Sequence, residues 1–598
     1  SHDEIGEALM CGIIGYIGDG AAAPFLIKAL KNLEYRGYDS AGIATISDGK
    51  VCAEKDVGKL EQVCGKHDLN GLPGNIGIGH VRWATHGDVT QANAHPHFDC
   101  KGEIAVVHNG IVENYQDLRT ALESNHRFVS QTDTEVIPHL IEEHMDAGAS
   151  LEEAVLKASK QLKGCYAFAA VSAREPDKIV ATRRESPLVV GSNNHKHFVA
   201  SDALAFLEET NRVVFIEDGE LVVLGKNVTF LDKDGHPVKK EFKEVDWKWD
   251  QATKQGYDFF MMKEILEEPQ AIRRATMQDR KLLLEMAIGI LRSKQVVITA
   301  CGTSRFAALV GRYLFSRLAS KFCDVIMASE FQYFSDSVDR NTLVIAVSQS
   351  GETADVIQGV KRAKENGATV YSLVNTVGSS LARMSDSVLY LNCGPEIGVA
   401  ATKTFVSQLA LFYLLSFTMA NRLDEGLQDL LAICPKIEEN VTRNNKRLQI
   451  LAQKTRDKND FYFIARGINF AIALEGALKM KEISYIHAEG MPAGELKHGT
   501  LALIDKGTPV VVICPNDYTY EETLANAHET KARGAFVIGV SEETHPIFDD
   551  WIVIPEVDEI FQPLVTVVPL QLLAYYSALT RGRDPDKPRN LAKSVTVK

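Results

Sequence analysis

Short apolar or alternating runs, separated by turn residues, fill the chain from residue 11 to about residue 223. Runs such as CGIIGYIG, IGIGHVRWAT and EIAVVHNGIV are typical of strands that turn one face toward a core. Helical periodicity appears between them, at residues 22–32, 114–124, 133–146 and 151–162. This pattern predicts an α+β domain of packed layers with several antiparallel strands.

From about residue 279 the pattern changes to continuous apolar runs, each followed by a stretch with helical periodicity. One set contains QVVITACG, TLVIAVSQSG and TVYSLVN, and a second set, which begins near residue 460, contains DFYFIARG, PVVVICPN and AFVIGVS. Apolar runs without alternation are typical of parallel strands that are buried on both faces. We therefore expect two α/β units, each with a parallel sheet flanked by helices.

The two α/β sets look like an internal repeat. Aligning ITACGTSRFAALVGRYLF with FIARGINFAIALEGALKM pairs Ala300 with Ala465, an offset of 165 residues that also brings Ser348 onto Ile513. The strand skeleton repeats, but the Ser/Thr-rich loop after Ser348 does not. We interpret this as a duplication in which one copy lost an anion-binding loop, and coincidence between two βαβ units remains the alternative.

Two segments stand apart from these patterns. Residues 236–278 are charged and aromatic with little periodicity, which predicts a linker between domains. One long uncharged run, TFVSQLALFYLLSFTMAN at residues 404–421, approaches the length of a membrane span. It contains several polar residues and no second candidate accompanies it, so we expect a buried core helix and no membrane partner.

Charge and cysteine usage narrow the class of protein. Lysine and arginine total 65 against 79 acidic residues, a net charge of −14, which argues against a nucleic-acid partner. None of the ten cysteines forms a C-x-x-C pair, as expected for free thiols in a reducing compartment rather than a disulfide framework or a zinc site. The polar, acidic first residues do not resemble a signal peptide. These features predict a cytoplasmic protein.

Two loops of the first α/β set offer hydroxyl groups at the start of a helix. Cys301-Gly302-Thr303-Ser304 follows one predicted strand, and Ser348-Gln349-Ser350-Gly351-Glu352-Thr353 follows another. Helix N-termini with Ser and Thr donors suit a phosphate group. Neither a GxxxxGK[ST] loop nor a GxGxxG loop after a strand occurs, so nucleotide binding is not indicated. Simple N-capping is the alternative.

Three further sets of residues could carry chemistry. Glu475, Lys479 and Glu482 fall on one helix face, where a salt bridge and proton transfer are both open interpretations. His95-x-His97 could begin a metal site, but no Asp or Cys joins it at ligand spacing, so we expect no metal. Cys11 follows Met10, and as a first residue it could use its own α-amine as general base, although most cysteines are inert.

The motifs together resemble the glucosamine-6-phosphate synthases, the isomerising glutamine–fructose-6-phosphate aminotransferases. The resemblance covers residues 11–598 and rests on CGIIGYIG, LEYRGYDSAG, RWATHG, VVHNGI, TDTEV, ACGTS, SQSGETAD, EIGVAATK, LEGALKMKEISYIHAE, AGELKHG and PRNLAKSVTV. It implies an α+β N-terminal-nucleophile glutaminase domain followed by two α/β SIS (sugar isomerase) domains. The implied ranges are 1–10 for an upstream extension or tag remnant, 11–235 for the glutaminase, 236–278 for a linker, 279–440 and 441–580 for the SIS domains, and 581–598 for a catalytic tail.

The resemblance also implies roles in the glutaminase half. Cys11 looks like the nucleophile, and Asn109 and Gly110 look like the oxyanion hole. The residues that would hold or enclose glutamine are Arg82, Trp83, His86 and Asp133, with Trp83 placed as the gate of an ammonia channel. Because ten residues precede Cys11, its nitrogen in this sequence is an amide, and we expect the glutaminase of the 598-residue form to be disabled.

In the isomerase half, Glu482 resembles the base that moves a proton between C1 and C2 of the sugar. His498 resembles the ring-opening residue, supplied by the partner in a homodimer, and Lys593 resembles the lysine that forms a Schiff base with the open-chain ketose. Two departures from the family are Ala401, where serine is common, and Thr500, where proline is common. The implied sugar-phosphate ligands are Cys301, Gly302, Thr303, Ser304, Ser348, Gln349, Ser350, Thr353 and Val399.

The implied reaction converts fructose 6-phosphate and glutamine to glucosamine 6-phosphate and glutamate, the first step of hexosamine synthesis, without a cofactor. Another glutamine amidotransferase is one alternative, but neither an acidic ribose-binding loop nor an SGGxDS loop is found. A non-catalytic sugar-phosphate sensor is the other, although a sensor needs neither a glutaminase half nor a tail lysine.

Overall fold

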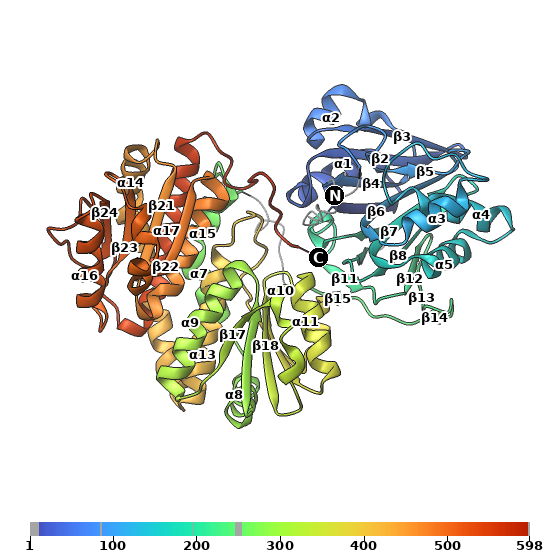
Figure 1. The fold of residues 1–598 in the computed structure, drawn as a ribbon. Coiled ribbons are helices and arrows are strands. Elements are labelled where there is room, and N and C mark those ends of the chain that lie inside the picture. The colour runs from blue at the N-terminus through green and yellow to red at the C-terminus, as the bar shows by residue number, and fades with distance from the viewer. Residues whose placement is uncertain (1–10, 84–86, 194, 246–253, 596–598) are drawn as a thin grey trace.

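The computed structural model describes residues 11–83, 87–193, 195–245 and 254–595. Figure 1 shows the N-terminal domain (blue to cyan) beside a C-terminal half made of two sheet-containing units (green to red). The last residues leave the second unit and return to the space between the halves. The fold therefore brings the end of the chain back to the N-terminal domain.

Two antiparallel sheets form the centre of the N-terminal domain. In the first, the order is β15-β11-β9-β10-β1-β4-β2-β3, and in the second it is β14-β13-β12-β8-β7-β6-β5. The first sheet consists of β1 (Gly12–Gly18), β2 (Ser40–Ser47), β3 (Lys50–Val57), β4 (Ile76–Arg82), β9 (Val189–Ser192), β10 (Lys196–Ala200), β11 (Arg212–Phe215) and β15 (Lys243–Glu244). The second consists of β5 (His97–Phe98), β6 (Ile104–Val112), β7 (Gly164–Ser172), β8 (Glu175–Arg184), β12 (Leu221–Leu224), β13 (Val228–Leu231) and β14 (Pro237–Val238).

Helices cover the outer face of each sheet, which gives the α+β layers that the sequence predicts. On the first sheet lie α1 (Ala22–Leu33) and α2 (Leu60–Lys66), and on the second lie α3 (Tyr115–Leu122), α4 (Val136–Asp146) and α5 (Leu151–Gln161). Successive residues of β1 belong to different cores: Ile13 packs between the sheets and Ile14 packs under α1. This alternation follows from the two-residue period of a strand.

Each C-terminal unit contains a parallel sheet. The first has the order β17-β16-β18-β19-β20 and the second the order β22-β21-β23-β24-β25. The strands are β16 (Gln295–Ala300), β17 (Asp324–Met327), β18 (Thr342–Ser348), β19 (Thr369–Val374), β20 (Ser387–Tyr390), β21 (Asp460–Ala465), β22 (His487–Pro492), β23 (Pro509–Ile513), β24 (Phe536–Ser541) and β25 (Asp550–Val553). Ala300 and Ala465 end equivalent strands, as do Ser348 and Ile513, so the predicted repeat is visible in the topology.

The helices of this half are α6 (Phe260–Leu266), α7 (Glu268–Ala275), α8 (Arg280–Arg292), α9 (Gly302–Ala319), α10 (Ala328–Phe331), α11 (Ala354–Glu365), α12 (Ser380–Met384), α13 (Lys403–Met419), α14 (Leu423–Lys454), α15 (Phe470–Ser484), α16 (Tyr520–Lys531) and α17 (Gln562–Thr580). Most of them pack on the sheets and on one another in one large apolar core, while α10, α11, α12 and α16 contribute to two smaller clusters. Every residue of α13 is buried, in agreement with the predicted core helix. The expectation that no second such segment occurs is wrong. In the part of the chain described, the helical segment Glu559–Thr580 has the length and apolar composition of a membrane span, and 89% of its apolar 18-residue window is buried inside the structure.

The predicted linker at 236–278 is largely ordered. Its first residues form β14, an edge strand of the second sheet, and β15, an edge strand of the first sheet. Its later residues form α6 and α7. Both helices contribute buried side chains, such as Met261 and Ile272, to the core of the C-terminal half. The segment lacks a clear period because its helices are short. The predicted boundary at residue 440 falls inside α14.

Candidate active sites

A cavity of about 660 Å³ opens at the carboxyl ends of β16 and β18. These strands are neighbours in a parallel sheet, with Ala300 opposite Val347, so the loops that follow them meet at one edge. All the residues predicted to bind the sugar phosphate line it: Cys301, Gly302, Thr303, Ser304, Ser348, Gln349, Ser350, Thr353 and Val399. Ala401, the departure from the family pattern, also lines it.

The loop after β18 is shaped by its own hydroxyl groups. The backbone N–H of Gly351 donates to Ser348 Oγ at 3.0 Å, and the N–H of Glu352 donates to Ser350 Oγ at 3.1 Å. Ser348 Oγ also lies 2.8 Å from Thr353 Oγ1, at the N-cap of α11. Gly351 has φ +67°, a conformation that favours glycine. The loop thus turns hydroxyl groups and the N-terminus of a helix toward the cavity.

Lys593 reaches the same cavity from the C-terminal tail. Its ammonium group is ion-paired with Glu396, and only 4% of the Lys593 side chain is exposed. The carboxylate of Glu396 also accepts bonds from the backbone N–H groups of Thr402 (2.9 Å) and Thr404 (3.1 Å). Although burial opposes it, the charge of Lys593 lowers the pKa of Glu396. A basic residue near a chain end would ordinarily be solvated, but the fold buries this one.

A second charged cluster touches the cavity through Thr303. The Thr303 hydroxyl lies 3.2 Å from Glu475 Oε1 and 3.1 Å from Lys479 Nζ, and Lys479 donates to Glu482 Oε2 at 2.6 Å. Burial raises the pKa of Glu475 to about 8, so near neutral pH Lys479 pairs mainly with Glu482. This face of α15 therefore carries an ion pair between Lys479 and Glu482, and Thr303 lies between that pair and the cavity.

His498 lies elsewhere. It is an exposed residue at the end of the short helix Ala493–His498, and among the described residues it does not line the cavity. Thr500 begins the next short helix, Thr500–Leu503. Within a single chain, the structure does not bring His498 to the other predicted residues.

In the N-terminal domain, Cys11 lies at the start of β1, beside the end of β4. The N–H of Trp83 donates to Cys11 Sγ at 3.2 Å, and Asn109 Nδ2 donates to the Cys11 carbonyl oxygen at 2.9 Å. Burial raises the pKa of the Cys11 thiol to about 11. The thiol therefore needs a base that removes its proton before it can attack a substrate.

The other predicted glutaminase residues surround Cys11. Arg82, at the end of β4, is buried and donates to the carbonyl oxygens of Gly87 and Asp88, each at 3.4 Å. Asp133 is buried and accepts the N–H of Val112 at 2.7 Å. Gly110 has φ +111°, and an added Cβ would lie 2.0 Å from a backbone oxygen, so glycine is required. His86 lies outside the described residues.

Three histidines of this domain, His80, His95 and His108, belong to one buried group. The rings of His80 and His95 stack with centroids 4.0 Å apart, while His95 and His108 both contact Thr134 Oγ1. His80 Nε2 lies 3.1 Å from Asn109 Oδ1, and burial lowers the pKa of His80 to about 3. His80 is therefore neutral and orients Asn109 beside Cys11.

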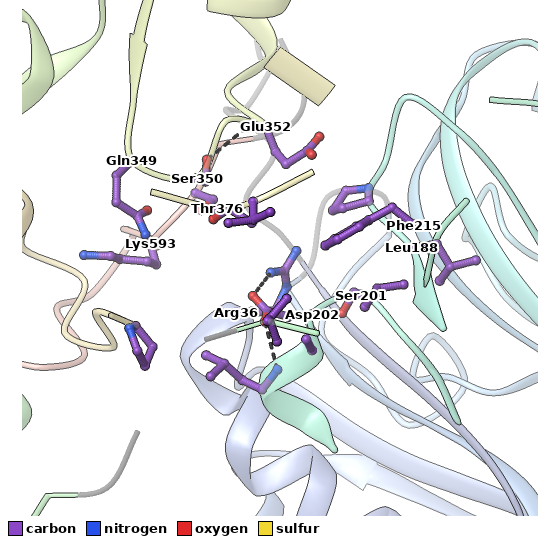
Figure 2. A pocket seen from close by; sticks show the side chains of 18 of the residues that line it. Arg36, Leu188, Ser201, Asp202, Phe215, Gln349, Ser350, Glu352, Thr376 and Lys593 are labelled. Carbon is purple, nitrogen blue, oxygen red and sulfur yellow. Dashed lines mark hydrogen bonds and ion pairs between the residues drawn. The ribbon is translucent and has the colours of Figure 1, made fainter. Parts of the chain in front are cut away.

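A smaller cavity, of about 70 Å³, lies between the two halves (Figure 2). Arg36 and Asp202 line it from the N-terminal domain, and Gln349, Ser350 and Lys593 line it from the other side. These last three residues also line the large cavity. Arg36 Nε donates to the Cys11 carbonyl oxygen at 3.3 Å, so the small cavity lies between the surroundings of Cys11 and Lys593.

Sequence reasoning did not single out Glu396 or Arg36. Glu396 lies in the motif EIGVAATK, which the sequence analysis includes. The sequence does not show, however, that Glu396 pairs with Lys593, which lies 197 positions later in the chain. Ser329, Glu330 and Tyr333 also line the large cavity without a sequence signal.

Comparison with known proteins agrees with this architecture. The profile of the glutamine amidotransferase domain family matches residues 80–208, and the SIS domain profile matches residues 289–417 and 454–581. The glutamine--fructose-6-phosphate aminotransferase [isomerizing] of Methanothermobacter thermautotrophicus is 51% identical over 98% of this chain and 100% of its own length, and that of Thermococcus kodakarensis is 49% identical over the same shares. The solved C-terminal domain of glucosamine-fructose-6-phosphate aminotransferase from Francisella tularensis is 34% identical, with a TM-score of 0.52, over 56% of this chain and 100% of that one.

The double SIS match corresponds to the repeated parallel sheets, and the amidotransferase match covers the part of the two antiparallel sheets from the end of β4 to β10. The relatives match 98% of this chain, so they cover both halves. The chain belongs to the family of isomerizing glutamine–fructose-6-phosphate aminotransferases.

Proposed function

We propose that the protein converts D-fructose 6-phosphate and L-glutamine to D-glucosamine 6-phosphate and L-glutamate. The observation that carries the proposal is the position of Lys593. This amine lines both the large cavity beside Ser348 and Ser350 and the small cavity that Arg36, a hydrogen-bond donor to the Cys11 carbonyl oxygen, lines from the other side. A sugar bound through its phosphate to the hydroxyl-rich loops would place its carbonyl carbon near an amine on one side and a source of ammonia on the other.

At the glutaminase site, Cys11 Sγ attacks the side-chain carbonyl carbon of glutamine. The oxyanion that forms would accept hydrogen bonds from Asn109 Nδ2 and the Gly110 N–H. Ammonia leaves as the thioester forms, and water then hydrolyses the thioester to release glutamate. Arg82 and Asp133 have the opposite charges needed for the α-carboxylate and α-ammonium groups of glutamine.

The base for Cys11 is its own α-amine, which requires Cys11 to be the first residue. A form that begins at Cys11 should release glutamate from glutamine, whereas the form with residues 1–10 should not, because its nitrogen is an amide. Both forms should isomerise fructose 6-phosphate. Equal glutamate release by both forms would contradict this assignment.

At the sugar site, the Glu396 carboxylate accepts the proton of the Lys593 ammonium. The free amine adds to C2 of the open-chain ketose, and water leaves as the imine forms. Ammonia from the glutaminase side then displaces the lysine amine at C2, and Glu482 moves a proton from C1 to C2 to give the aldose. The small cavity between the halves supports transfer of ammonia without release to solvent.

The family resemblance implies a histidine for ring opening, and no histidine is among the described lining residues of the cavity in one chain. We assign it to His498 of the partner subunit in a homodimer, because His498 is exposed in its own chain. The test of the whole proposal is to incubate the Cys11-first form with fructose 6-phosphate and glutamine and to assay hexosamine phosphate. Binding of the sugar phosphate without any product would instead indicate a sensor.

A further inference from the structure

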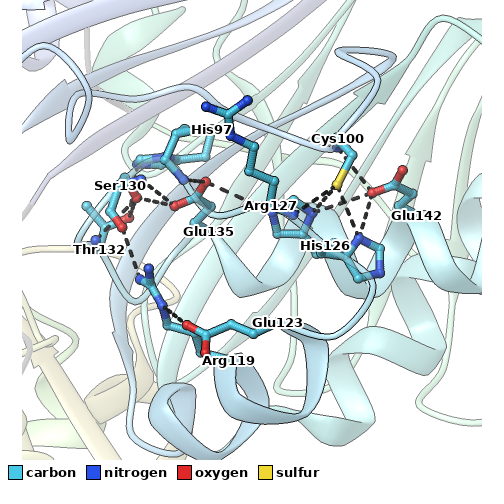
Figure 3. A network of polar contacts seen from close by, with 12 residues as sticks. His97, Cys100, Arg119, Glu123, His126, Arg127, Ser130, Thr132, Glu135 and Glu142 are labelled. Carbon is cyan, nitrogen blue, oxygen red and sulfur yellow. Dashed lines mark hydrogen bonds and ion pairs between the residues drawn. The ribbon is translucent and has the colours of Figure 1, made fainter.

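Four metal-ligating side chains converge in the N-terminal domain at a place that the proposed reaction does not use. They are Cys100, His126, His139 and Glu142, and one ligand atom from each lies within 4.8 Å of all the others. Figure 3 shows Cys100, His126 and Glu142 meeting at one end of a network of polar contacts. His139 and Glu142 are buried, His126 is half-buried and Cys100 is exposed, so an ion could reach the site from solvent.

Three separate segments supply the four groups. Cys100 lies in the turn between β5 and β6, and His126 lies in the loop between α3 and α4. His139 and Glu142 are three residues apart on α4, which places them on one helix face. The N–H of Cys100 also donates to Glu142 Oε2 at 3.1 Å, which fixes the turn against the helix.

The distances between the ligand atoms fit a tetrahedron. Cys100 Sγ lies 3.4 Å from His126 Nδ1 and 3.7 Å from His139 Nδ1. Glu142 Oε2 lies 3.0 Å from His126 Nδ1 and 3.4 Å from His139 Nδ1. An ion with metal–sulfur bonds of ~2.3 Å and metal–nitrogen or metal–oxygen bonds of ~2.0–2.2 Å requires edges of about 3.3–3.6 Å. Small shifts would therefore complete the coordination.

The outer nitrogens of both imidazoles support the same interpretation. Nε2 of His126 and Nε2 of His139 are buried, and within the described ranges neither has a hydrogen-bond partner. Each faces a carboxylate, at 3.6 Å from Glu143 and 4.0 Å from Glu135 respectively. A metal on Nδ1 places the imidazole proton on Nε2, and carboxylates commonly receive that proton in metal sites.

We propose that Cys100, His126, His139 and Glu142 bind one zinc ion. A thiolate and two imidazoles favour zinc over magnesium or calcium, and four protein ligands leave no open position for a substrate. The ion would join the turn before β6 and the loop before α4 to α4 itself. The sequence predicts no metal because the cysteines lack C-x-x-C spacing and because no Asp or Cys joins the His95-x-His97 pair. The ligands of the proposed site come from segments whose approach depends on the fold.

The site also lies near the glutamine-binding segment. Glu135, which faces His139, accepts the N–H groups of Val129 and Ser130, each at 2.7 Å, and Asp133 lies in the same loop. Zinc would therefore hold the segment that positions Asp133. This consequence rests on the proposed function, but zinc binding itself does not.

The test measures metal directly in the full chain. After removal of metal by a chelator and incubation with zinc, the protein is desalted and its zinc is counted by elemental mass spectrometry. We expect one zinc per chain in the wild type and in two matched controls, His144→Gln on α4 and Cys52→Ser on β3. Loss of a residue that only hydrogen-bonds a ligand lowers metal affinity by ~10–100-fold. Cys100→Ser and His126→Gln each remove a ligand itself, so their zinc affinity should fall by more than this.

Cobalt and alkylation give readouts that do not depend on activity. Cobalt(II) should produce a thiolate-to-cobalt charge-transfer band and the strong visible absorption of a four-coordinate ion, and Cys100→Ser should lose the band. In the wild type, zinc should protect Cys100 but not Cys52 from alkylation, which peptide mass spectrometry can map. Because this measurement needs no variant, it tests the proposal even if the variants do not fold. Absence of bound zinc in the wild type, or equal alkylation of Cys100 with and without zinc, would overturn the proposal.

Discussion

The ammonium group of Lys593 is ion-paired with the buried carboxylate of Glu396, a residue 197 positions earlier in the chain. The pairing holds the C-terminal tail against the first parallel-sheet unit. The tail also accepts the N–H of Ala354 at the Val595 carbonyl (3.0 Å), at the start of α11. An amine and a carboxylate are thus fixed together beside the hydroxyl-rich loops, where amine chemistry on a phosphorylated sugar requires them.

The role of Lys593 predicts a covalent adduct. Borohydride added with fructose 6-phosphate should reduce the imine and leave a sugar adduct on Lys593. Lys593→Arg keeps the charge but should abolish trapping, whereas Lys587→Arg, another tail lysine that pairs with Glu34, should not. Peptide mass spectrometry locates the adduct. An adduct on Lys479 or Lys481 would move the Schiff base to the second unit.

The loop after β18 predicts a loss of sugar-phosphate affinity in Ser350→Ala. A hydrogen bond to a charged group contributes ~1.5–3 kcal/mol, so the Kd for fructose 6-phosphate should rise by roughly 10–150-fold. Ser293→Ala, at the end of α8, is the matched control, because among the contacts described the Ser293 hydroxyl bonds only to the Gly289 carbonyl oxygen in its own segment. Titration calorimetry measures both. An unchanged Kd in Ser350→Ala would argue against the phosphate position.

The buried Glu475 predicts a pH dependence of stability. Burial raises its pKa from 4.5 to about 8, so between these two pH values the folded chain holds a proton that the unfolded chain has lost. The stability that protonated Glu475 contributes is therefore fully present below this pH range and declines as the pH rises through it. Glu475→Gln should flatten this decline in apparent Tm, while Glu489→Gln on β22 should not. Parallel curves for wild type and Glu475→Gln would contradict the raised pKa.

The position of His498 predicts complementation between subunits. His498→Ala and Lys593→Arg should each be inactive as pure proteins. When the two variants are co-expressed, the mixed dimer has one site with neither defect and one site with both, so synthesis of glucosamine 6-phosphate should return. Activity is measured on the purified mixed dimer. If that dimer forms and is inactive, His498 acts within its own chain or not at all.

Features that depend on local patterns could be predicted from the sequence. The strand ends at Ala300 and Ser348 predicted adjacent hydroxyl-rich loops, and the offset to Ala465 predicted the repeated sheet order. Features that depend on distant contacts could not be predicted. The Lys593–Glu396 pair and the meeting of Cys100 with α4 join segments that no periodicity relates, and α6 and α7 are too short for their period to be visible.

The central claim is that the amide nitrogen of glutamine reaches the sugar through the interior of the protein. The direct measurement supplies the Cys11-first form with fructose 6-phosphate, glutamine carrying an isotope-labelled amide nitrogen and an excess of unlabelled ammonium. We predict that the glucosamine 6-phosphate formed carries the label, because the proposed path of ammonia from Cys11 to Lys593 runs through the cavity lined by Gln349 and Ser350. Product that contains mainly unlabelled nitrogen, or no hexosamine phosphate at all, would contradict the account.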